Sequence, residues 1–232
     1  MLTTVTITGA DDNTPAQALI DLSAEFPFVE WGILVSMLRG GLRFPSREWT
    51  SDFSRKAADN NLQVSMHVCG EWVRRILKGK MDWNDFPEVR IVAERVQINT
   101  HAKEHVSTSA VIDWFAARSC KEFILQLDGV NDLVFDACVH RNLRVTGLFD
   151  GSHGAGRLPD AWPTPYWPQL SRYGYAGGLG PLNVEAEIPR IREARRNLDF
   201  WIDMEGRVRD EREHLDLLKV RKVLEICAPF VG

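Results

Sequence analysis

Two stretches of the chain place residues that can do chemistry directly after short apolar runs. In "LFDGSHGAGR" (148–157) an acid is followed by a His and three glycines, and in "YGYAGGLGPLNVEAEI" (173–188) a Gly-Gly pair precedes a segment with a helical pattern. A carboxyl group in such a place is suited to proton transfer, and glycine N–H groups approach a phosphate closely because no Cβ intervenes. Two interpretations follow: a site for a small anionic ligand, or tight turns without a chemical role.

Polar side chains also end the other apolar runs of the sequence. Taken alone, each has a structural explanation: His67 is equally well a hydrogen-bonded core residue, and Asp128 before Gly129 equally well shapes a turn. Taken as a set, they favour a ligand site, because so many ionisable groups at run ends are hard to explain by packing. The set comprises Thr8, Ser36, His67, Cys69, Asn99, His101, Gln126, Asp128, Asp150, Gly177, Gly178, Asp203 and Glu205.

The apolar runs read as strands that alternate with amphipathic segments of helix length. Thr14 is the expected N-cap of the first helix, with Pro15 at its first position, and Ser46 is the expected N-cap of the second. Residues 81–95 hold either one helix or two short pieces. Strands are expected at 4–10, 28–36, 62–69, 96–101, 122–129, 143–150, 173–178 and 198–205, and the clearest later helices at 107–118, 131–142, 181–196 and 210–227.

Eight strand–helix units in 232 residues predict an α/β fold, a single (β/α)8 TIM barrel with one domain over residues 1–232. The alternative is a doubly wound open sheet, which is disfavoured because no GxGxxG motif follows the first strand. In a barrel the carboxyl ends of all strands meet at one mouth. The polar residues at the run ends are therefore expected to line a common cavity.

Composition narrows the classes of partner. A formal charge of −4 with an isoelectric point near 5.9 gives no basic footprint for nucleic acid. No apolar run approaches the roughly 18–20 residues of a membrane span, and the N-terminus lacks the pattern of a signal peptide. Four cysteines without a CxxC pair suit a reducing compartment, so we expect a cytoplasmic protein. The oligomeric state stays open, a homodimer included.

These motifs resemble phosphoribosylanthranilate isomerase, a barrel enzyme that performs an Amadori rearrangement. "YAGGLGPLNVEAEI" resembles the seventh strand and phosphate loop of that family, "FDGSHGAGR" its sixth-strand acid and glycine-rich loop, and "GGLRFPSREW" its loop after strand two. The resemblance implies Asp150 as general acid and a small phosphorylated or anionic substrate, without a cofactor. It implies substrate or phosphate binding by Arg43, Gly154, Gly156, Arg157, Gly177 and Gly178.

The chain departs from the family pattern at two places. Thr8 stands where the family has its general base, a Cys, and an aliphatic hydroxyl is too weak a base for that step. We therefore expect a diverged reaction, with Asp128 as the best replacement base and His67 as another catalytic candidate. After strand eight, "IDMEGRVRD" replaces a Ser-Gly phosphate loop. Asp203 and Glu205 therefore add carboxylates to the expected phosphate site, and Gly206, Arg207 and Arg209 are expected to offset them in part.

Two other functions remain open at this point. Metal-dependent epimerases, lyases and hydrolases use the residue types found at His67, His101, Asp128, Asp150 and Asp203, although no HxH or HExxH motif is present. A catalytically degenerate barrel that only binds a ligand is also compatible with the loss of the Cys. The aromatic segment 160–170 is expected either to cover a bound ring or to pack over the barrel rim.

Overall fold

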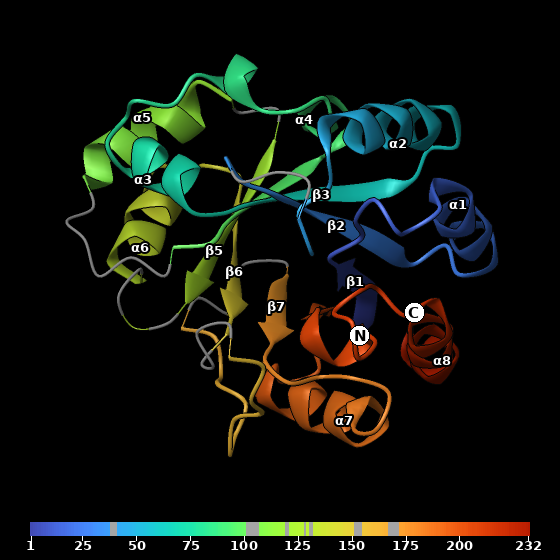
Figure 1. The fold of residues 1–232 in the computed structure, drawn as a ribbon. Helices are drawn as coiled ribbons and strands as arrows, with labels where there is room; N and C mark the ends of the chain where they lie inside the picture. Colours follow the sequence, from blue (N-terminus) through green and yellow to red (C-terminus); the bar gives the residue numbers. More distant parts are fainter. Residues whose placement is uncertain are drawn as a thin grey trace.

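The chain folds as eight parallel strands closed into a barrel (Figure 1). The computed structural model describes residues 1–37, 41–100, 107–118, 121–127, 129, 132–150, 155–166 and 172–232. The strands pair in chain order, and the last pairs with the first, which confirms the (β/α)8 barrel and rules out the open sheet. They are β1 (Leu2–Thr8), β2 (Val29–Val35), β3 (Gln63–Val68), β4 (Arg95–Ile98), β5 (Glu122–Leu127), β6 (Val145–Phe149), β7 (Tyr173–Ala176) and β8 (Phe200–Met204).

Helices surround the barrel, and most lie where the sequence pattern predicts them (Figure 1). Ser46 caps the second helix as expected, because its hydroxyl accepts a hydrogen bond from the Trp49 N–H. Residues 81–95 form two short pieces, η1 (Trp83–Asp85) and α4. The helices are α1 (Ala16–Glu25), α2 (Arg47–Asp59), α3 (Glu71–Leu77), α4 (Val89–Val92), α5 (Thr108–Ala116), α6 (Asp132–His140), α7 (Val184–Ala194) and α8 (Leu217–Cys227), with the further turns η2 (Gly206–Val208) and η3 (Ala228–Phe230).

Three predicted helix starts are wrong. Thr14 does not cap α1, because its hydroxyl accepts the N–H of Asp11 in the preceding loop. The seventh helix begins at Val184 rather than at residue 181, after a turn in which the Asn183 side chain accepts the N–H of Gly180. The eighth begins at 217 rather than 210, since a side-chain cap at residue 216 and a short antiparallel bridge hold the preceding segment out of the helix.

No helix follows β6 within the described residues 155–166. Three prolines in this segment, Pro159, Pro163 and Pro165, remove backbone donors and disfavour a helix. Trp162 instead covers this side of the barrel: its ring packs edge-on against Tyr175, and its indole N–H donates to the Glu187 carboxylate at 2.7 Å. The packing interpretation of the aromatic segment is therefore the correct one for Trp162.

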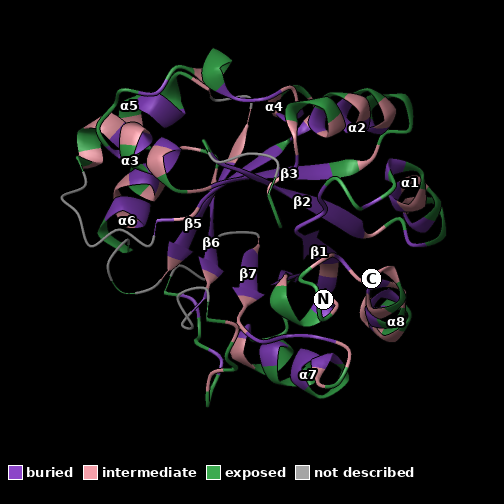
Figure 2. Cartoon of the chain, in the orientation of Figure 1, coloured by how far each residue is buried: buried purple, intermediate pink, exposed green. Residues whose placement is uncertain are grey.

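The outward faces of the strands carry apolar side chains, and the inward faces carry mostly polar ones. Outward residues such as Val5, Trp31 and Phe123 join the large apolar core beneath the helices, and most strand residues are buried (Figure 2). Inside the barrel the apolar residues Ile124, Leu148 and Trp201 form a separate small cluster. Most other inward positions are buried and polar, namely Thr4, Thr6, Thr8, Glu30, Ser65, His67, Arg95, Gln97, Gln126, Thr146, Asp150 and Asp203.

The inward positions near the strand starts hold a buried ion pair. The guanidinium of Arg95 binds both carboxylate oxygens of Glu30 at 3.1 and 3.2 Å and lies 3.5 Å from Glu122. It also stacks over the Trp201 ring, 4.1 Å from the ring centre. The Thr6 hydroxyl donates to the same Glu30 carboxylate at 2.8 Å. This cluster joins five strands, β1, β2, β4, β5 and β8, across the barrel axis. Among the described residues, no helix is long and apolar enough to cross a membrane.

We expect Glu30→Ala to lower the free energy of unfolding by about 3–5 kcal/mol, because it leaves the Arg95 charge buried without its carboxylate. Urea denaturation followed by circular dichroism measures the change. Asp52→Ala, which removes an exposed partner of Arg55, is the control and should shift the unfolding midpoint far less. Equal shifts in the two variants would contradict the structural role of the buried pair.

Candidate active site

A cavity of about 410 Å³ opens at the carboxyl ends of the barrel strands. This is the mouth at which the sequence predicts a site. Its floor is made by side chains from the strands and its rim by the loops that follow β6, β7 and β8. The described lining residues are Thr8, Arg43, His67, Gln97, Asn99, Gln126, Leu148, Asp150, Ala155, Gly156, Ala176, Gly177, Gly178, Leu179, Asp203, Met204, Glu205, Gly206, Arg207 and Glu213.

A chain of hydrogen bonds crosses the cavity floor. The Thr8 hydroxyl donates to Asp203 Oδ1 at 2.8 Å, and the His67 Nδ1 lies 3.5 Å from the same hydroxyl. The other ring nitrogen of His67 lies 2.9 Å from the Ser65 hydroxyl. Gly32 makes this approach possible, because a Cβ there would lie 2.3 Å from the Thr8 hydroxyl and 2.9 Å from the His67 ring. The floor thus links four neighbouring strands.

Burial lowers the pKa of His67 and raises the pKa of Asp203, so it favours the neutral form of both floor residues. Loss of hydration, together with the Arg95 charge, lowers the pKa of His67 to about 3, so the imidazole is neutral. Loss of hydration raises the pKa of Asp203 to about 8, aided by Glu205, Glu30 and Asp150 and opposed by the Thr8 hydrogen bond. At neutral pH the floor therefore holds a neutral imidazole and a carboxyl group that is mostly protonated.

Amide side chains line the next part of the floor. Gln97 donates through Nε2 to Asn99 Oδ1 at 2.7 Å, and Asn99 donates through Nδ2 to the Cys69 sulfur at 3.1 Å. Burial raises the pKa of the Cys69 thiol to about 12, so it does not act as a thiolate at neutral pH. This side of the site supplies neutral hydrogen-bonding groups.

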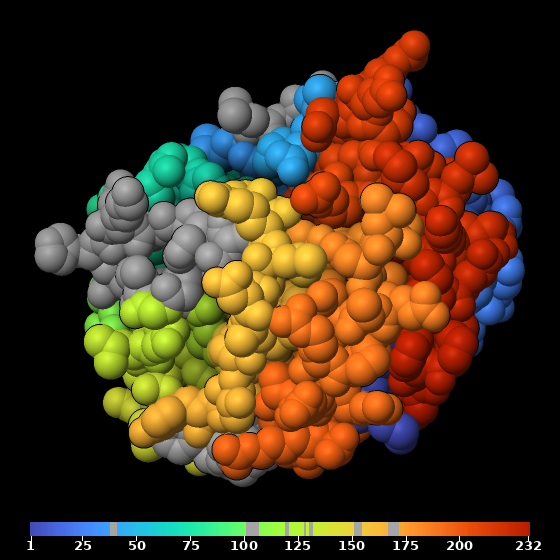
Figure 3. All heavy atoms as spheres, turned by 90° about the horizontal axis from the view of Figure 1, so that it is seen from below, coloured from blue at the N-terminus to red at the C-terminus, as the bar shows by residue number. Residues whose placement is uncertain are grey.

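The glycine turn after β7 lies under the loop that follows β6. Gly178 has φ of +68°, which favours glycine. A Cβ on Gly178 would lie 2.8 Å from the Gly156 carbonyl oxygen and 2.7 Å from the Leu158 nitrogen. Figure 3 shows the two segments side by side, gold against orange. Arg207 packs against the same turn, since a Cβ on Gly180 would lie 2.4 Å from its Cβ.

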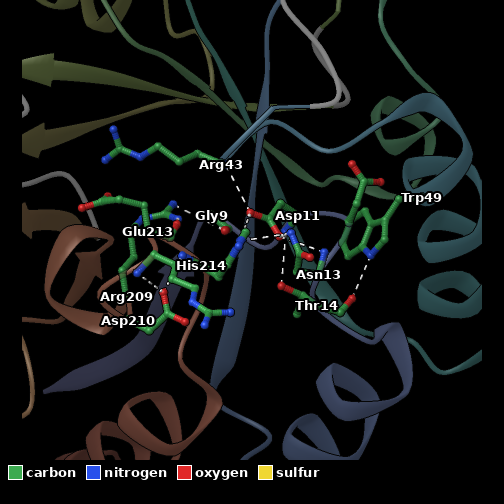
Figure 4. A network of polar contacts seen from close by, with 12 residues as sticks. Gly9, Asp11, Asn13, Thr14, Arg43, Trp49, Arg209, Asp210, Glu213 and His214 are labelled. Atoms are coloured by element: carbon green, nitrogen blue, oxygen red, sulfur yellow. Dashed lines mark hydrogen bonds and ion pairs between the residues drawn. The ribbon is translucent and has the colours of Figure 1, made fainter.

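Charged side chains at the rim are tied to one another. Glu205 Oε1 lies 2.8 Å from Arg43 Nε and 3.1 Å from Arg209 Nη2. Arg209 also donates to the carbonyl oxygens of Glu213 at 2.6 Å and Gly9 at 3.4 Å, as seen in the polar network of Figure 4. Glu205 is therefore matched by two arginines, and Arg209 is buried in this network rather than lining the cavity.

The network extends to the loop after β1 (Figure 4). Asp11 accepts the backbone N–H of Arg43 at 3.3 Å and lies 3.4 Å from His214 Nδ1. The Asn13 side chain lies 3.0 Å from the same His nitrogen. Three loops, those after β1, β2 and β8, are thereby fixed together on one side of the mouth. These contacts fix the position of Arg43 at the cavity rim.

Most of the residues singled out from the sequence do meet at this cavity. Arg157 is exposed and is not among the described lining residues, although its backbone lies over Gly178. Asp128, Gly154 and His101 lie outside the described residues. Ser36 and Cys69 are not among the described lining residues either. Those that line the cavity are Thr8, Arg43, His67, Asn99, Gln126, Asp150, Gly156, Gly177, Gly178, Asp203, Glu205 and Arg207.

Sequence reasoning missed Gln97 and Glu213 as lining residues. Gln97 occupies an inward position within "VQINTH", and the alternation of that strand was the available signal. Glu213 lies in the segment that was expected to be helical, so nothing pointed to it. Among the described residues, no group of three or more His, Cys, Asp or Glu side chains is arranged to hold a metal ion.

Comparison with known proteins identifies the fold. No protein-family model and no curated protein matches the chain. Phosphoribosyl anthranilate isomerase from Thermus thermophilus is similar with a TM-score of 0.61 at 16% identity, over 98% of this chain and 99% of that one. A truncated 3-deoxy-D-arabino-heptulosonate 7-phosphate synthase from Thermotoga maritima is similar with a TM-score of 0.57 at 12% identity, over 99% and 86%.

A glycoside hydrolase family 30 xylanase from Clostridium acetobutylicum is also similar, with a TM-score of 0.53 at 10% identity, over 97% of this chain and 70% of that one. The distant resemblance to phosphoribosylanthranilate isomerase is thus confirmed at the level of the fold. At these identities the likeness establishes the barrel and does not choose among the reactions of its neighbours.

We expect Asp203→Asn to change how stability depends on pH. The pKa of Asp203 is raised to about 8 in the folded protein, above the unfolded value of about 3.9. Between these values the folded state binds more protons, so this group lowers stability as pH rises, by up to about 1.4 kcal/mol per pH unit. Asn does not titrate. The stability of the variant relative to the parent should increase from about pH 5 to about pH 8.

Urea denaturation of both proteins across this pH range measures the difference, in which the contributions of groups that do not interact with Asp203 cancel. A stability difference that stays flat with pH would show that Asp203 titrates like an exposed carboxyl group.

Proposed function

We propose that this chain is an enzyme that moves protons on a small phosphorylated or otherwise anionic substrate bound in the barrel mouth. One observation carries the proposal. A single cavity joins the carboxyl groups of Asp150 and Asp203 to the glycine turn at Gly177 and Gly178 and to Arg207. Carboxyl groups serve proton transfer, while glycine N–H groups and an arginine suit an anion. The similar solved structures include barrel enzymes whose names refer to phosphorylated compounds.

The turn after β7 is the proposed binding site for the anionic group of the substrate. Gly177 and Gly178 both have positive φ, +114° and +68°, a backbone that brings successive N–H groups close to a ligand. Arg207 lies beside this turn and lines the cavity. The helix dipole expected from residue 181 contributes less, because the helix begins at Val184 and carries acids in its first turn.

Two carboxylates that the sequence sets against phosphate do not oppose it in this geometry. Glu205 is matched by Arg43 and Arg209. Asp203 belongs to β8 itself, accepts a hydrogen bond from Thr8, and is mostly protonated at neutral pH. The repulsion between a phosphate and a carboxylate is therefore much smaller than the sequence suggests.

The carboxyl groups of Asp150 and Asp203 are the proposed proton-transfer groups. Asp150 lines the cavity and is the proposed general acid, as the family resemblance implies. His67 is a poor base, since its pKa is lowered to about 3 and both ring nitrogens face hydroxyl groups. Thr8 donates to Asp203 and is not a base either. A carboxylate then takes the place of the missing Cys. Asp128, proposed for this role from the sequence, lies outside the described residues.

The proposed reaction is related to the Amadori rearrangement of phosphoribosylanthranilate isomerase without being that reaction, because the strand-one base is replaced. The proposed partner is the small anionic substrate alone, in the cytoplasm. The thiols of Cys69, Cys138 and Cys227 are free, which suits a reducing compartment.

We expect inorganic phosphate to bind the protein, and Arg207→Met to weaken that binding about tenfold, which corresponds to the loss of one charge-assisted contact. Isothermal titration calorimetry measures both affinities. Arg212→Met removes an exposed arginine that does not line the cavity and should leave the affinity unchanged. If both variants bind phosphate like the parent, the anion does not sit beside Arg207.

We expect the protein to exchange carbon-bound hydrogen with solvent in at least one aldose or ketose phosphate. Proton abstraction next to a carbonyl group leaves deuterium in the substrate when the reaction runs in heavy water, and NMR detects it. Asp150→Asn should reduce the exchange rate by about a hundredfold or more, whereas Asp160→Asn, a change on an exposed loop, should not. Phosphate binding without exchange in any substrate would favour a barrel that only binds its ligand.

A further inference from the structure

We propose that Asp203 is the base that replaces the missing strand-one Cys, and that Thr8, His67 and Ser65 are the positioning residues that hold it for this step. This inference rests on the proposed function, because it names the proton acceptor of the same cavity. It stands on the geometry of four side chains from β1, β3 and β8 at the cavity floor.

The hydrogen bonds of this group have one consistent direction. An ionised Asp203 can only accept, so the Thr8 hydroxyl donates to its Oδ1 at 2.8 Å. The Thr8 oxygen is then the acceptor for His67 Nδ1, 3.5 Å away, which places the imidazole proton on Nδ1. His67 Nε2 is left as the acceptor for the Ser65 hydroxyl at 2.9 Å. Every donor points toward the carboxylate.

A chain of donors directed at one oxygen has two consequences. Successive hydrogen bonds polarise one another, so the chain favours the ionised form of Asp203 more than an isolated hydroxyl would. It also fixes Oδ1 toward Thr8. Asp203 lines the cavity, and its Oδ2 makes no hydrogen bond to another described residue, so Oδ2 is the oxygen left for substrate.

Gly32 leaves the space that this hydrogen-bond chain occupies. A Cβ at Gly32 would collide with the Thr8 hydroxyl at 2.3 Å and with the His67 ring at 2.9 Å. All three donors are buried, with exposed fractions of 0–2%. A buried polar chain that ends on a cavity-lining carboxyl group is expected where orientation of that group matters.

The proton balance of the step is closed within the site. Asp203 Oδ2 takes a proton from the substrate carbon, the C–H bond breaks, and its electron pair moves into the substrate. The Asp150 carboxyl group gives a proton to the substrate heteroatom, so no net proton is gained. Solvent exchange resets both groups. A base with a pKa near the working pH is better suited to this step than an ordinary carboxylate.

The charged groups around Asp203 raise its pKa, whereas the hydrogen-bond chain lowers it. Glu30 lies deeper in the barrel, Asp150 directly follows β6, and Glu205 directly follows β8, and all three disfavour ionisation of Asp203. Burial lowers the pKa of His67, and the charge of Arg95 on β4 lowers it further, so the imidazole is neutral. The hydrogen-bond chain therefore has a measurable effect: it lowers the pKa of Asp203, which burial and the three acids raise.

The test follows the titration of Asp203 by NMR with carbon-13-labelled aspartate, using Asp203→Asn to assign the signal. Thr8→Val keeps the side-chain shape and removes the donor, so we expect the Asp203 midpoint to move upward by about one pH unit or more. Thr8→Ser restores a hydroxyl and should restore the midpoint. Thr146→Val alters another buried inward threonine and should not move it.

Deuterium exchange into an aldose or ketose phosphate supplies the second readout. The exchange rate should rise with pH through the Asp203 midpoint, shift to higher pH in Thr8→Val, and fall by about a hundredfold or more in Asp203→Asn. An unmoved midpoint in Thr8→Val would overturn the positioning role, and parental exchange in Asp203→Asn would overturn the base. Either result leaves phosphate binding and the dependence on Asp150 intact. If the titration responds but no substrate exchanges, the base assignment fails together with the proposed function.

Discussion

Closure of the barrel brings the first strand beside the last, and the hydrogen bond from Thr8 to Asp203 lies at that closure. The two residues are 195 positions apart in sequence and 2.8 Å apart in space. Because the barrel interior excludes water, a polar side chain placed there must find a protein partner. The remaining polar interior follows from this constraint, since each inward group on one strand depends on a group supplied by its neighbours.

The interior has two levels with different consequences. Near the strand starts, Glu30 and Arg95 compensate each other's charge and join several strands. Near the mouth, burial favours the neutral forms of His67 and Asp203. The levels are coupled, because Arg95 disfavours a charged His67 and Glu30 disfavours a charged Asp203. Burial is the larger cause, and the ion pair that stabilises the barrel adds to the shift in the pKa of both groups.

The rim shows how loops far apart in sequence determine the charge of a site. Glu205 follows β8, yet its charge is offset by Arg43 from the loop after β2 as well as by Arg209. Gly9 is required for this arrangement, since a Cβ there would lie 1.7 Å from the Arg209 side chain. A carboxylate that appears to oppose an anion in the linear sequence is thus compensated by side chains from other loops.

The sequence by itself determined the barrel, the strand order and the mouth at which polar residues gather. Periodicity of apolar residues is a local property, and eight alternating units leave few ways to close a sheet. It also located the glycine turn after β7, because Gly177 and Gly178 adopt a backbone conformation that few other residues tolerate. Helix starts were less secure, since Asn183 and Asp216 form turns and caps through side-chain contacts that propensity does not report.

Only the tertiary structure decided what the polar residues do. His67 looks like a base in the sequence, but its burial beside Arg95 keeps it neutral and weakly basic. Asp203 looks like an obstacle to phosphate, but burial and the nearby acids raise its pKa at the cavity floor, and the Thr8 hydroxyl that donates to it opposes that rise. Protonation depends on hydration and on charges that arrive from distant strands, and neither quantity is a property of local sequence.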